Sequence, residues 1–368
     1  MENLQPRRLN ARRLLIIGVV CAVASGVITS LFLFKSPKTN PDVLSTQTVL
    51  PSPPPLPEDL ADLTSLTLLL LGYGGPGHEG GFLTDAIMVA QIDFESNKVS
   101  YISIPRDLWV VFPDGVSRKI NSAFAHGGKL PEISTTDLDE EKADSGSGIV
   151  KSIVTNVTGL PINYFVAIDF VGLQRAIGQV LEGIEVDVPE TLDDPWYPVE
   201  GRQLEPCDHT PEEIGELTEK YSGFELQKHF KCRYEHLYFE KGKTQMEGAD
   251  VLKYVRSRHS SSDFGRSRRQ VDVLLGVKNK LLKLKALDKA GEFFESLLYT
   301  IQTDLDVSVV KYLAPAIKSA KDFKIKTIHL DTTNVFKESK SSSGQSILLP
   351  KAGENNWKKV HDLIELEI

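Results

Sequence analysis

Residues 65–107 read SLTLLLLGYGGPGHEGGFLTDAIMVAQIDFESNKVSYISIPRD, with apolar runs separated by a glycine-rich loop and a polar turn. The first run, Ser65–Gly72, is apolar almost throughout, which is typical of a strand buried on both faces of a sheet. The next two, Ala86–Ile92 and Val99–Ile104, flank the residues DFESNK and predict a β-hairpin. The stretch therefore predicts the centre of a β-sheet with a glycine-rich loop at one end.

Downstream of this stretch, strand and helix patterns alternate. Tyr164–Ile168 and Ile184–Val188 are strand-like, and the residues between them have helical periodicity. Such a strand–helix–strand unit favours an α/β layer architecture. A last strand is predicted at Lys324–Leu330, and helices are predicted at Gln245–Val255, Ser267–Lys285, Ala290–Ile301 and Val307–Lys318. We expect a single domain over residues 61–368, with an insertion at 189–233.

The N-terminal segment differs from the rest of the chain. Residues Leu14–Phe34 are uncharged and long enough to cross a bilayer as a helix. Four arginines and a single glutamate precede them, so the positive-inside rule keeps residues 1–13 in the cytoplasm. A cleaved signal peptide is the alternative, but the apolar run is longer than its hydrophobic region. We expect an uncleaved transmembrane anchor, single-pass and type II in the cell membrane, with the folded part extracytoplasmic.

A proline-rich stretch follows the predicted span. Residues 35–60 hold seven prolines together with Ser, Thr and Asp, a composition that favours an extended spacer. Cys207 and Cys232 are the two cysteines beyond it. Because we expect that part of the chain in a compartment that permits oxidation, we predict a structural disulfide between them.

Composition limits the classes of function. The chain has 368 residues, 25% of them charged and 41% hydrophobic, as in ordinary globular proteins. A net charge of −8 makes a general nucleic-acid binder a poor first hypothesis. The sequence has no metal-ligand spacing of cysteines or histidines and no Walker A or G-x-S-x-G motif. Any anion-binding site must therefore be local.

Two carboxylates are predicted to meet at the end of the hairpin. A turn centred at Ser96 sets Asp85 opposite Asp107, with Arg106 beside them, and Pro105 favours the end of a strand there. Carboxylates bind hard cations such as Mg²⁺, and an arginine binds phosphate oxygens. The pattern is therefore a candidate site for a cation and a phosphate. The alternative is a salt bridge that caps the hairpin.

A basic cluster lies in the second half of the chain. The twenty residues that end at Gln270 include six Lys or Arg and one Asp. If the chain is extended after a helix, Arg256 and Arg258 point the same way. Arg266, Arg269 and Gln270 share one face of the next predicted helix near its N-terminus, where a bound anion is favoured. The alternative is a solvated basic stripe or a nucleic-acid patch.

Together these residues resemble the LytR-CpsA-Psr family of bacterial envelope proteins. The resemblance covers about residues 63–355 and includes the type II anchor. The motifs that carry it are SIPRD (103–107), KINSAFAHGG (119–128), YFVAIDFVGL (164–173), GIEVDV (183–188), GADVLKYVRSR (248–258) and DFGRSRRQ (263–270). The resemblance implies a central mixed β-sheet flanked by helices in three layers (α/β/α), with a long apolar pocket for a polyprenyl chain. It also implies a phosphotransferase that moves a glycopolymer, with its linking phosphate, from a polyprenyl pyrophosphate carrier to a hydroxyl of peptidoglycan or another cell-wall acceptor.

The resemblance also assigns residues by matching motif. Asp85 and Asp107 are expected to hold Mg²⁺ or Mn²⁺, and Arg106 to bind the pyrophosphate. The residues expected to bind the phosphates are Arg256, Arg258, Arg266, Arg269 and Gln270, with Lys119 as a further contact. The acceptor hydroxyl is then the nucleophile, and Asp85 or Asp107 is the candidate for accepting its proton.

Two features depart from the family pattern. Leu83 stands where the family has an arginine before its Thr/Ser-Asp pair, so one phosphate contact is missing or comes from Lys119 or from amides of the glycine-rich loop. The stretch 189–233 is longer than expected. The alternatives to a ligase are a polyprenyl pyrophosphate pyrophosphatase and a non-catalytic lipid-binding or regulatory envelope protein. Only about 13 residues precede the predicted span, too few for a DNA-binding domain.

Overall fold

The computed structural model describes residues 64–78, 80–126, 146–257, 263–283, 295, 297–319 and 323–368. All of them belong to one unit, Leu50–Ile368. The predicted membrane span at 14–34 and the linker at 35–60 lie outside these residues. Among the helices that are described, none combines the length and the apolar character needed to cross a bilayer.

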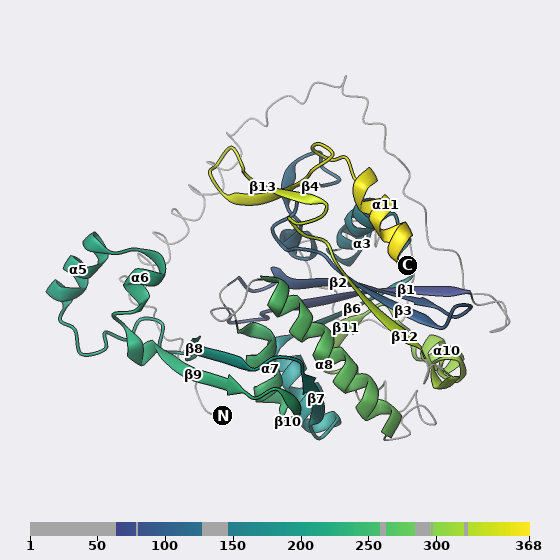
Figure 1. Cartoon of the computed structure of the whole chain (residues 1–368), viewed down its shortest axis with the longest axis horizontal. Helices are drawn as coiled ribbons and strands as arrows, with labels where there is room; N and C mark the ends of the chain where they lie inside the picture. The colour runs from purple at the N-terminus through teal and green to yellow at the C-terminus, as the bar shows by residue number, and fades with distance from the viewer. Residues whose placement is uncertain are drawn as a thin grey trace, which may run out of the picture. The chain divides into compact units, whose positions relative to one another are not determined.

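A six-stranded mixed sheet forms the centre of the fold (Figure 1), in the order β11-β6-β1-β2-β3-β12. Its strands are β1 (Ser65–Tyr73), β2 (Thr84–Asp93), β3 (Lys98–Ser103), β6 (Tyr164–Asp169), β11 (Ile301–Thr303) and β12 (Lys324–His329). β1 lies between the parallel β6 and the antiparallel β2, and β3 lies between the antiparallel β2 and the parallel β12. Leu66 and Leu69 of β1 are buried in separate clusters. This agrees with the strand buried on both faces that its apolar run predicts.

Helices cover both faces of the sheet. The face that carries Leu69 and Ile87 packs on α2 (Ala123–His126), α3 (Gly146–Thr158) and α11 (Lys358–Glu367). The elements of the other face are α4 (Phe170–Arg175), the π-helical η4 (Ala176–Val180), α7 (Gly248–Arg256), α8 (Asp263–Lys283) and α10 (Val307–Ser319). The expected α/β fold with a central mixed sheet between helices is thus confirmed.

Pairs of short strands complete the described fold. They are β4 (Trp109–Val111) with β5 (Ser117–Lys119), β7 (Ile184–Val188) with β10 (Gly242–Met246), β8 (Leu192–Pro198) with β9 (Tyr234–Phe239), and β13 (Phe336–Lys340) with β14 (Ser346–Pro350). β7 therefore does not join the central sheet, because its buried Ile184 and Val186 pack with α7 and α8 in a second core. The helix predicted from Gln245 begins at Gly248, because Gln245 lies in strand β10, where it pairs with Glu185 of β7.

The β2–β3 hairpin has a different register from the predicted one. A turn centred at Ser96 pairs Gln91 with Tyr101, whereas the structure pairs Gln91 with Ser100. The reason is an even-numbered loop. Asp93 and Lys98 close the hairpin, and Oδ1 of Asp93 accepts hydrogen bonds from the amides of Glu95 and Ser96. The predicted register is therefore wrong by one residue.

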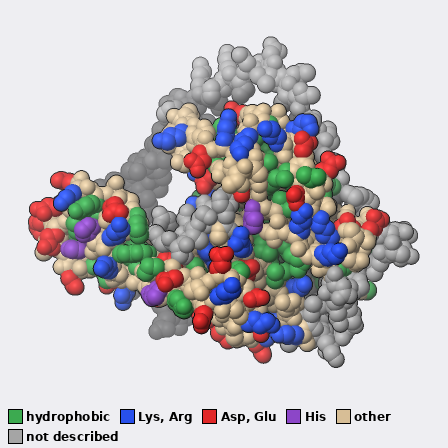
Figure 2. All heavy atoms as spheres, viewed as in Figure 1, with side chains coloured by type: hydrophobic (Ala, Val, Ile, Leu, Met, Phe, Trp, Pro, Cys, Tyr) green, Lys and Arg blue, Asp and Glu red, His purple; other side chains and the backbone are tan. Residues whose placement is uncertain are grey.

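The predicted insertion contains helices of its own. Besides β8 it holds α5 (Pro211–Lys220), α6 (Gly223–Gln227) and the 3₁₀ turn η5 (Lys231–Arg233). Outside the insertion, another 3₁₀ turn, η2 (Ile120–Ser122), precedes α2. α5 and α6 form a lobe at the end of the β8–β9 pair (Figure 1), and acidic side chains gather on it (Figure 2). A disulfide joins Cys207 and Cys232 within this lobe. Most of the helix predicted at Ala290–Ile301 lies outside the described residues, and Ile301 begins β11.

Candidate active site

Two acidic residues and an arginine meet at the end of the β2–β3 hairpin. Asp85 is the second residue of β2, and Arg106 and Asp107 lie in a turn just beyond β3. The amide of Leu108 closes this turn by donating to the carbonyl of Pro105. Leu108 is fully buried, whereas Arg106 and Asp107 stay partly exposed. The buried leucine therefore fixes the turn that presents the two charged side chains.

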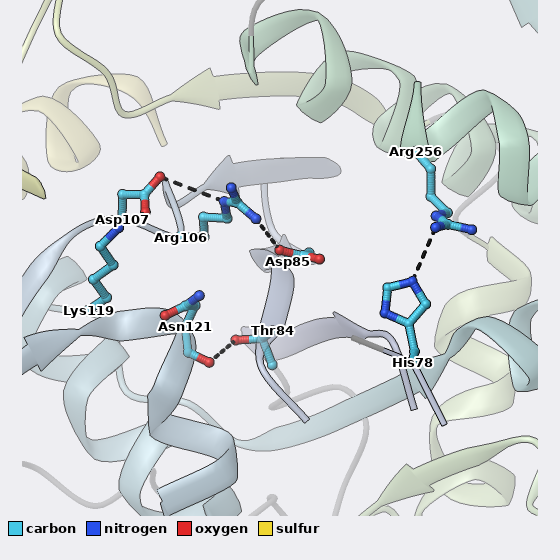
Figure 3. A network of polar contacts seen from close by, with 8 residues as sticks. All are labelled: His78, Thr84, Asp85, Arg106, Asp107, Lys119, Asn121 and Arg256. Carbon is cyan, nitrogen blue, oxygen red and sulfur yellow. Dashed lines mark hydrogen bonds and ion pairs between the residues drawn. The ribbon is translucent and has the colours of Figure 1, made fainter. Parts of the chain in front are cut away.

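Four charged side chains alternate in sign across this end of the sheet (Figure 3). Nη1 of Arg106 lies 2.5 Å from Oδ1 of Asp85, and its Nε lies 3.6 Å from Oδ2 of Asp107. Nζ of Lys119 donates to Oδ1 of Asp107 at 2.6 Å. The four side chains are between 24% and 41% exposed, so each pair contributes little to stability. The sheet end thus gathers four of the predicted site residues where a charged ligand can reach them.

A second set of cations comes from the end of α7 and the first turns of α8. Arg256 ends α7, and its Nη2 lies 3.2 Å from Nε2 of His78 in the glycine-rich loop (Figure 3). Its guanidinium carbon lies 4.4 Å from the centre of the Phe170 ring, which is within the range of a cation–π contact. Arg266 and Gln270 lie one turn apart on α8, and both line a cavity together with Arg256. Residues that are far apart in the sequence therefore converge on one opening.

Of the other predicted phosphate ligands, Arg258 lies outside the described residues, and Arg269 is placed away from the cavities. Arg269 is 6% exposed, and its guanidinium donates to the carbonyls of Tyr254 and Ser257. Burial lowers the pKa of Arg269 from its ordinary value. These contacts hold the backbone at the end of α7, so Arg269 positions Arg256. A direct contact between Arg269 and a phosphate stays a prediction.

An apolar cavity of about 770 Å³ is lined in part by Arg256 and Arg266. One wall is the sheet, and the opposite wall consists of α4, η4 and α8. Its apolar lining includes Leu70, Met88, Val166, Ile168, Leu173, Ile177, Leu181, Val273, Leu274, Val277 and Leu281. Its polar lining residues are His78, Asp85, Asp169, Arg256, Arg266 and Gln270. Such a cavity matches a ligand with an apolar chain and an anionic head.

A second cavity of about 580 Å³ adjoins the first. The two cavities share Asp85, Ala86, Arg266 and Gln270 as lining residues. The second cavity is more polar, and Arg106 and Asp107 line only this one. The shared residues therefore form the boundary between an apolar chamber and a polar chamber.

The carboxylates of Asp85 and Asp107 suit a divalent cation that also binds substrate phosphates. Among the described residues, no group of three His, Cys, Asp or Glu side chains is placed to hold a metal ion. Mg²⁺, however, is commonly bound by one or two carboxylates together with substrate phosphates and water. Asp85 and Asp107 lie on either side of Arg106 (Figure 3), and they are the two carboxylates that would hold such a cation together with substrate phosphates.

The sequence did not single out His78 or His329 as functional residues. His78 lies at the opening of the apolar cavity beside Arg256, and its position between glycines just upstream of Asp85 is the signal that points to it. His329 ends β12 and lines the polar cavity, for which the sequence offers no signal. Leu83, which replaces the family arginine, is 38% exposed and lines neither cavity.

The sequence is similar to known bacterial proteins. The family model described as the LytR_cpsA_psr family matches residues 45–358. The regulatory protein MsrR of Staphylococcus aureus strain COL is 26% identical over 267 residues, which cover 72% of this chain and 64% of that protein. The polyisoprenyl-teichoic acid–peptidoglycan teichoic acid transferase TagU of Enterococcus faecalis is 24% identical over 259 residues, covering 70% of this chain and 66% of that protein. The chain thus spans less than two thirds of the length of these relatives.

Solved structures share the fold. Bacillus subtilis TagV superimposes with a TM-score of 0.55 at 21% identity, covering 83% of this chain and 97% of that one. TagT bound to LI-WTA superimposes with a TM-score of 0.52 at 18% identity, covering 82% and 89%. Because the family model matches most of the sequence and the expected architecture is present, this chain belongs to the LytR_cpsA_psr family.

Proposed function

We propose that this protein is a cell-wall polymer ligase. It moves a glycopolymer, with its linking phosphate, from a polyprenyl pyrophosphate carrier to a hydroxyl of a cell-wall acceptor. The observation that carries the proposal is the apolar cavity of about 770 Å³ that opens on Asp85, Arg256 and Arg266. TagU of E. faecalis supports the proposal, because its name describes transfer of teichoic acid from a polyisoprenyl-linked form to peptidoglycan.

The donor occupies the apolar cavity and its mouth. The prenyl chain lies between the sheet and α8, where burial of apolar surface favours binding by about 25 cal/mol per Å². The pyrophosphate lies at the cavity opening against Arg256, Arg266 and Gln270, with Arg106 and Lys119 close by. Arginine suits this position because its planar guanidinium forms paired hydrogen bonds to phosphate oxygens.

The reaction is a displacement at the phosphorus next to the glycan. The acceptor oxygen forms a bond to that phosphorus while the bond to the bridging oxygen breaks, and polyprenyl monophosphate leaves. Fixed cations stabilise the charge that spreads over the phosphate oxygens in the transition state. Mg²⁺ or Mn²⁺ held by Asp85 and Asp107 supplies further positive charge to the same oxygens when it is bound. The chain's own contribution is to bind, orient and neutralise the donor.

The proposal also includes a location. The span at 14–34 anchors the protein in the cell membrane as a single-pass type II protein, the linker at 35–60 separates it from the catalytic unit, and the unit lies outside the cytoplasm. A lipid-linked donor and a wall acceptor both lie within reach there. Protease added to intact cells should cleave the unit while a tag at the N-terminus stays protected.

The activity is tested with the full chain, geranylgeranyl pyrophosphate and Mg²⁺. Mass spectrometry follows the release of geranylgeranyl monophosphate. We expect Asp107→Ala and Arg256→Ala to lower the rate by about 10²-fold or more, because each removes charge at the phosphates. Lys283→Ala is the matched control. Lys283 lies on α8 with a 67% exposed side chain and lines neither cavity, so the rate of monophosphate release should stay unchanged.

Added acceptor separates the proposed ligase from the alternatives. With a prenyl-pyrophosphate-linked disaccharide donor and peptidoglycan tetrasaccharide, a ligase forms a phosphodiester-linked product. A pyrophosphatase releases phosphate and forms no such product, and a lipid-binding regulatory protein leaves the donor intact. Equal rates for the wild-type chain and both site variants would refute the proposed site.

A further inference from the structure

The polar cavity lies at the ends of two parallel strands. Ser103 of β3 and His329 of β12 are register partners and both line it. On the next strand Met88 is the partner of Ser103 and lines the apolar cavity. These partners form a row across one face of the sheet, because cross-strand neighbours project to the same side. The row leads from the apolar chamber directly into the polar one.

The polar cavity has the lining of a carbohydrate site. Hydroxyl groups come from Ser103, Ser267, Thr332, Ser339 and Ser346, and charged groups from Asp331, Glu338 and Lys340. The β13–β14 hairpin supplies Glu338, Ser339, Lys340 and Ser346. A sugar carries hydroxyls and amides that need many donors and acceptors when they leave water, because an unpaired buried polar group is costly. The apolar cavity offers its ligand no comparable set of hydrogen-bond donors and acceptors.

The position of the cavity suits an attacking group. A phosphate held at Arg266 and Gln270 faces both chambers, since these residues line both. In phosphoryl transfer the attacking and leaving oxygens are roughly in line on opposite sides of the phosphorus. With the prenyl phosphate in the apolar chamber, the attacking hydroxyl arrives from the polar one.

His329 is placed to face that hydroxyl. Its neighbours Ile328 and Leu330 are 5% and 2% exposed in the core of the opposite sheet face, so the imidazole projects into the polar cavity. Nδ1 of His329 is buried and has no hydrogen-bond partner among the described residues. Asp85 and Asp107, by contrast, already accept from Arg106 and Lys119. A buried nitrogen without a partner in the protein is suited to a hydrogen bond with a bound ligand.

The charges around His329 favour its neutral form. Burial lowers the pKa of His329 from its ordinary value, Arg268 lowers it further, and Asp331 opposes them. The other charged groups that line the cavity are Asp85, Arg106, Asp107, Arg266, Glu338 and Lys340. A neutral imidazole at neutral pH can accept a proton.

We propose that the polar cavity receives the acceptor sugar and that His329 is the base that takes the proton of its attacking hydroxyl. This inference rests on the proposed function. The oxygen–hydrogen bond of the acceptor breaks, and its proton goes to the imidazole. The same oxygen bonds to the phosphorus, and the electron pair of the broken phosphorus–oxygen bond leaves with polyprenyl monophosphate. The imidazolium then returns its proton to water.

The test uses the full chain, a prenyl-pyrophosphate-linked disaccharide donor and peptidoglycan tetrasaccharide. We expect His329→Gln and His329→Ala to lower transfer by about 10²-fold, the lower end for loss of a general base. Donor affinity, measured by calorimetry, should stay within about twofold, since His329 does not line the apolar cavity. Added imidazole should restore part of the transfer by His329→Ala. A purely structural role does not predict that rescue.

Thr327→Ala is the matched control. Thr327 lies on the same face of β12, two residues earlier, and lines neither cavity. Its transfer rate should equal that of the wild-type chain. Full transfer by His329→Gln, or a loss that imidazole does not restore while the variant folds with wild-type thermal stability, overturns the role of His329. Absence of transfer by the wild-type chain overturns the proposed function itself and the role of His329 with it.

Discussion

Asp272 is a carboxylate behind the cavity wall. The Tyr254 hydroxyl donates to its Oδ2 at 3.2 Å, and burial raises the pKa of Asp272 to about 6, against lowering effects of Arg268 and Arg269. Burial and the Asp272 charge also raise the pKa of Tyr254. This polar contact joins α7 to α8, the two helices that carry Arg256 and Arg266.

Replacing Asp272 by Asn should make the folded chain more stable at pH 8. The pKa of Asp272 in the folded state is about 6, above its ordinary value of about 4. Its contribution to stability is therefore largest below about pH 4 and is lost as the pH rises through 6. After allowance for solvent screening we expect a gain of roughly 1 kcal/mol at pH 8 that vanishes near pH 4. Urea unfolding of the wild-type chain and the variant at both pH values measures this gain. A stability difference that does not change with pH would contradict the prediction.

At the residue scale, the sequence predicted the carboxylate and arginine cluster but not the histidines. Asp85, Arg106 and Asp107 could be found because a hairpin and a strand-ending proline bring them together over a short stretch. His329 is separated from Ser103 by more than two hundred residues of sequence. Its place depends on β12 pairing with β3, which no local pattern encodes.

The contact between α4 and α7 depends on a glycine. A Cβ on Gly248 at the start of α7 would lie 2.2 Å from the carbonyl oxygen of Gln174 in α4. Backbone atoms cannot give way cheaply at that distance. The two helices can therefore approach this closely only without a side chain there, and the approach sets where Arg256 lies.

Gly248→Ala should lower the free energy of unfolding by about 1–3 kcal/mol, the usual cost of overpacking. Donor affinity should fall with it, because α7 shifts and carries Arg256 along. Gly215→Ala is the matched control, since a Cβ at Gly215 in α5 meets nothing within 4 Å. It should raise stability by up to about 1 kcal/mol, the helix propensity difference between Gly and Ala. Denaturant unfolding measures the change in the free energy of unfolding for both variants. Equal changes would refute the predicted clash at Gly248.

The Cys207–Cys232 disulfide belongs to the lobe and not to the catalytic unit's core. The described helices α5 and α6 have no buried residues, so little apolar packing holds the lobe together. The bridge closes a segment with a sequence separation of 25 residues, which by chain entropy is worth about 3 kcal/mol.

Cys207→Ser with Cys232→Ser should therefore open the lobe locally. Hydrogen exchange of the amides in α5 and α6 should speed up by about 10²-fold, while the central sheet stays protected. Cleavage of geranylgeranyl pyrophosphate should persist, because neither cysteine lines a cavity. Loss of sheet protection in the double variant would show that the bridge supports the whole fold instead.

At the scale of the whole molecule, one sheet face serves two chambers. The apolar chamber lies between the sheet and α8, and the polar chamber lies between the sheet and the β13–β14 hairpin. Both chambers depend on α8, because its residues Arg266 and Gln270 line each of them. A change in the shape of the apolar chamber should therefore alter which lipid binds without removing the phosphate site.

Val277→Phe should discriminate between prenyl chains by length. Val277 lines the apolar cavity about two turns along α8 from Gln270, so a larger ring there blocks the far part of the chamber. We expect the affinity for geranylgeranyl pyrophosphate to fall by about tenfold, equivalent to burying about two fewer CH₂ groups. Geranyl pyrophosphate should bind as before. Asn279→Phe adds the same ring on an exposed position of α8 and should change neither affinity, as calorimetry can check.

By itself, the sequence predicted most strands of the central sheet and the family. The apolar run at Ser65–Gly72, the hairpin and the basic helix start are local patterns. Their periodicity and their motifs predicted an α/β fold and the sides of an anion site. Local patterns also misplaced the hairpin register by one residue, because hydrogen bonds from the amides of Glu95 and Ser96 to the Asp93 side chain favour a shorter, four-residue loop.

Tertiary structure alone decided the two chambers. Burial of β7 in a second core, the close contact of α4 with α7 and the pairing of β12 with β3 all join segments distant in the chain. Such contacts depend on the packing of whole faces, which side-chain periodicity does not specify. For that reason Arg269, a predicted phosphate ligand, lies against backbone carbonyls, and His329, which no motif in the sequence marks, lines a cavity.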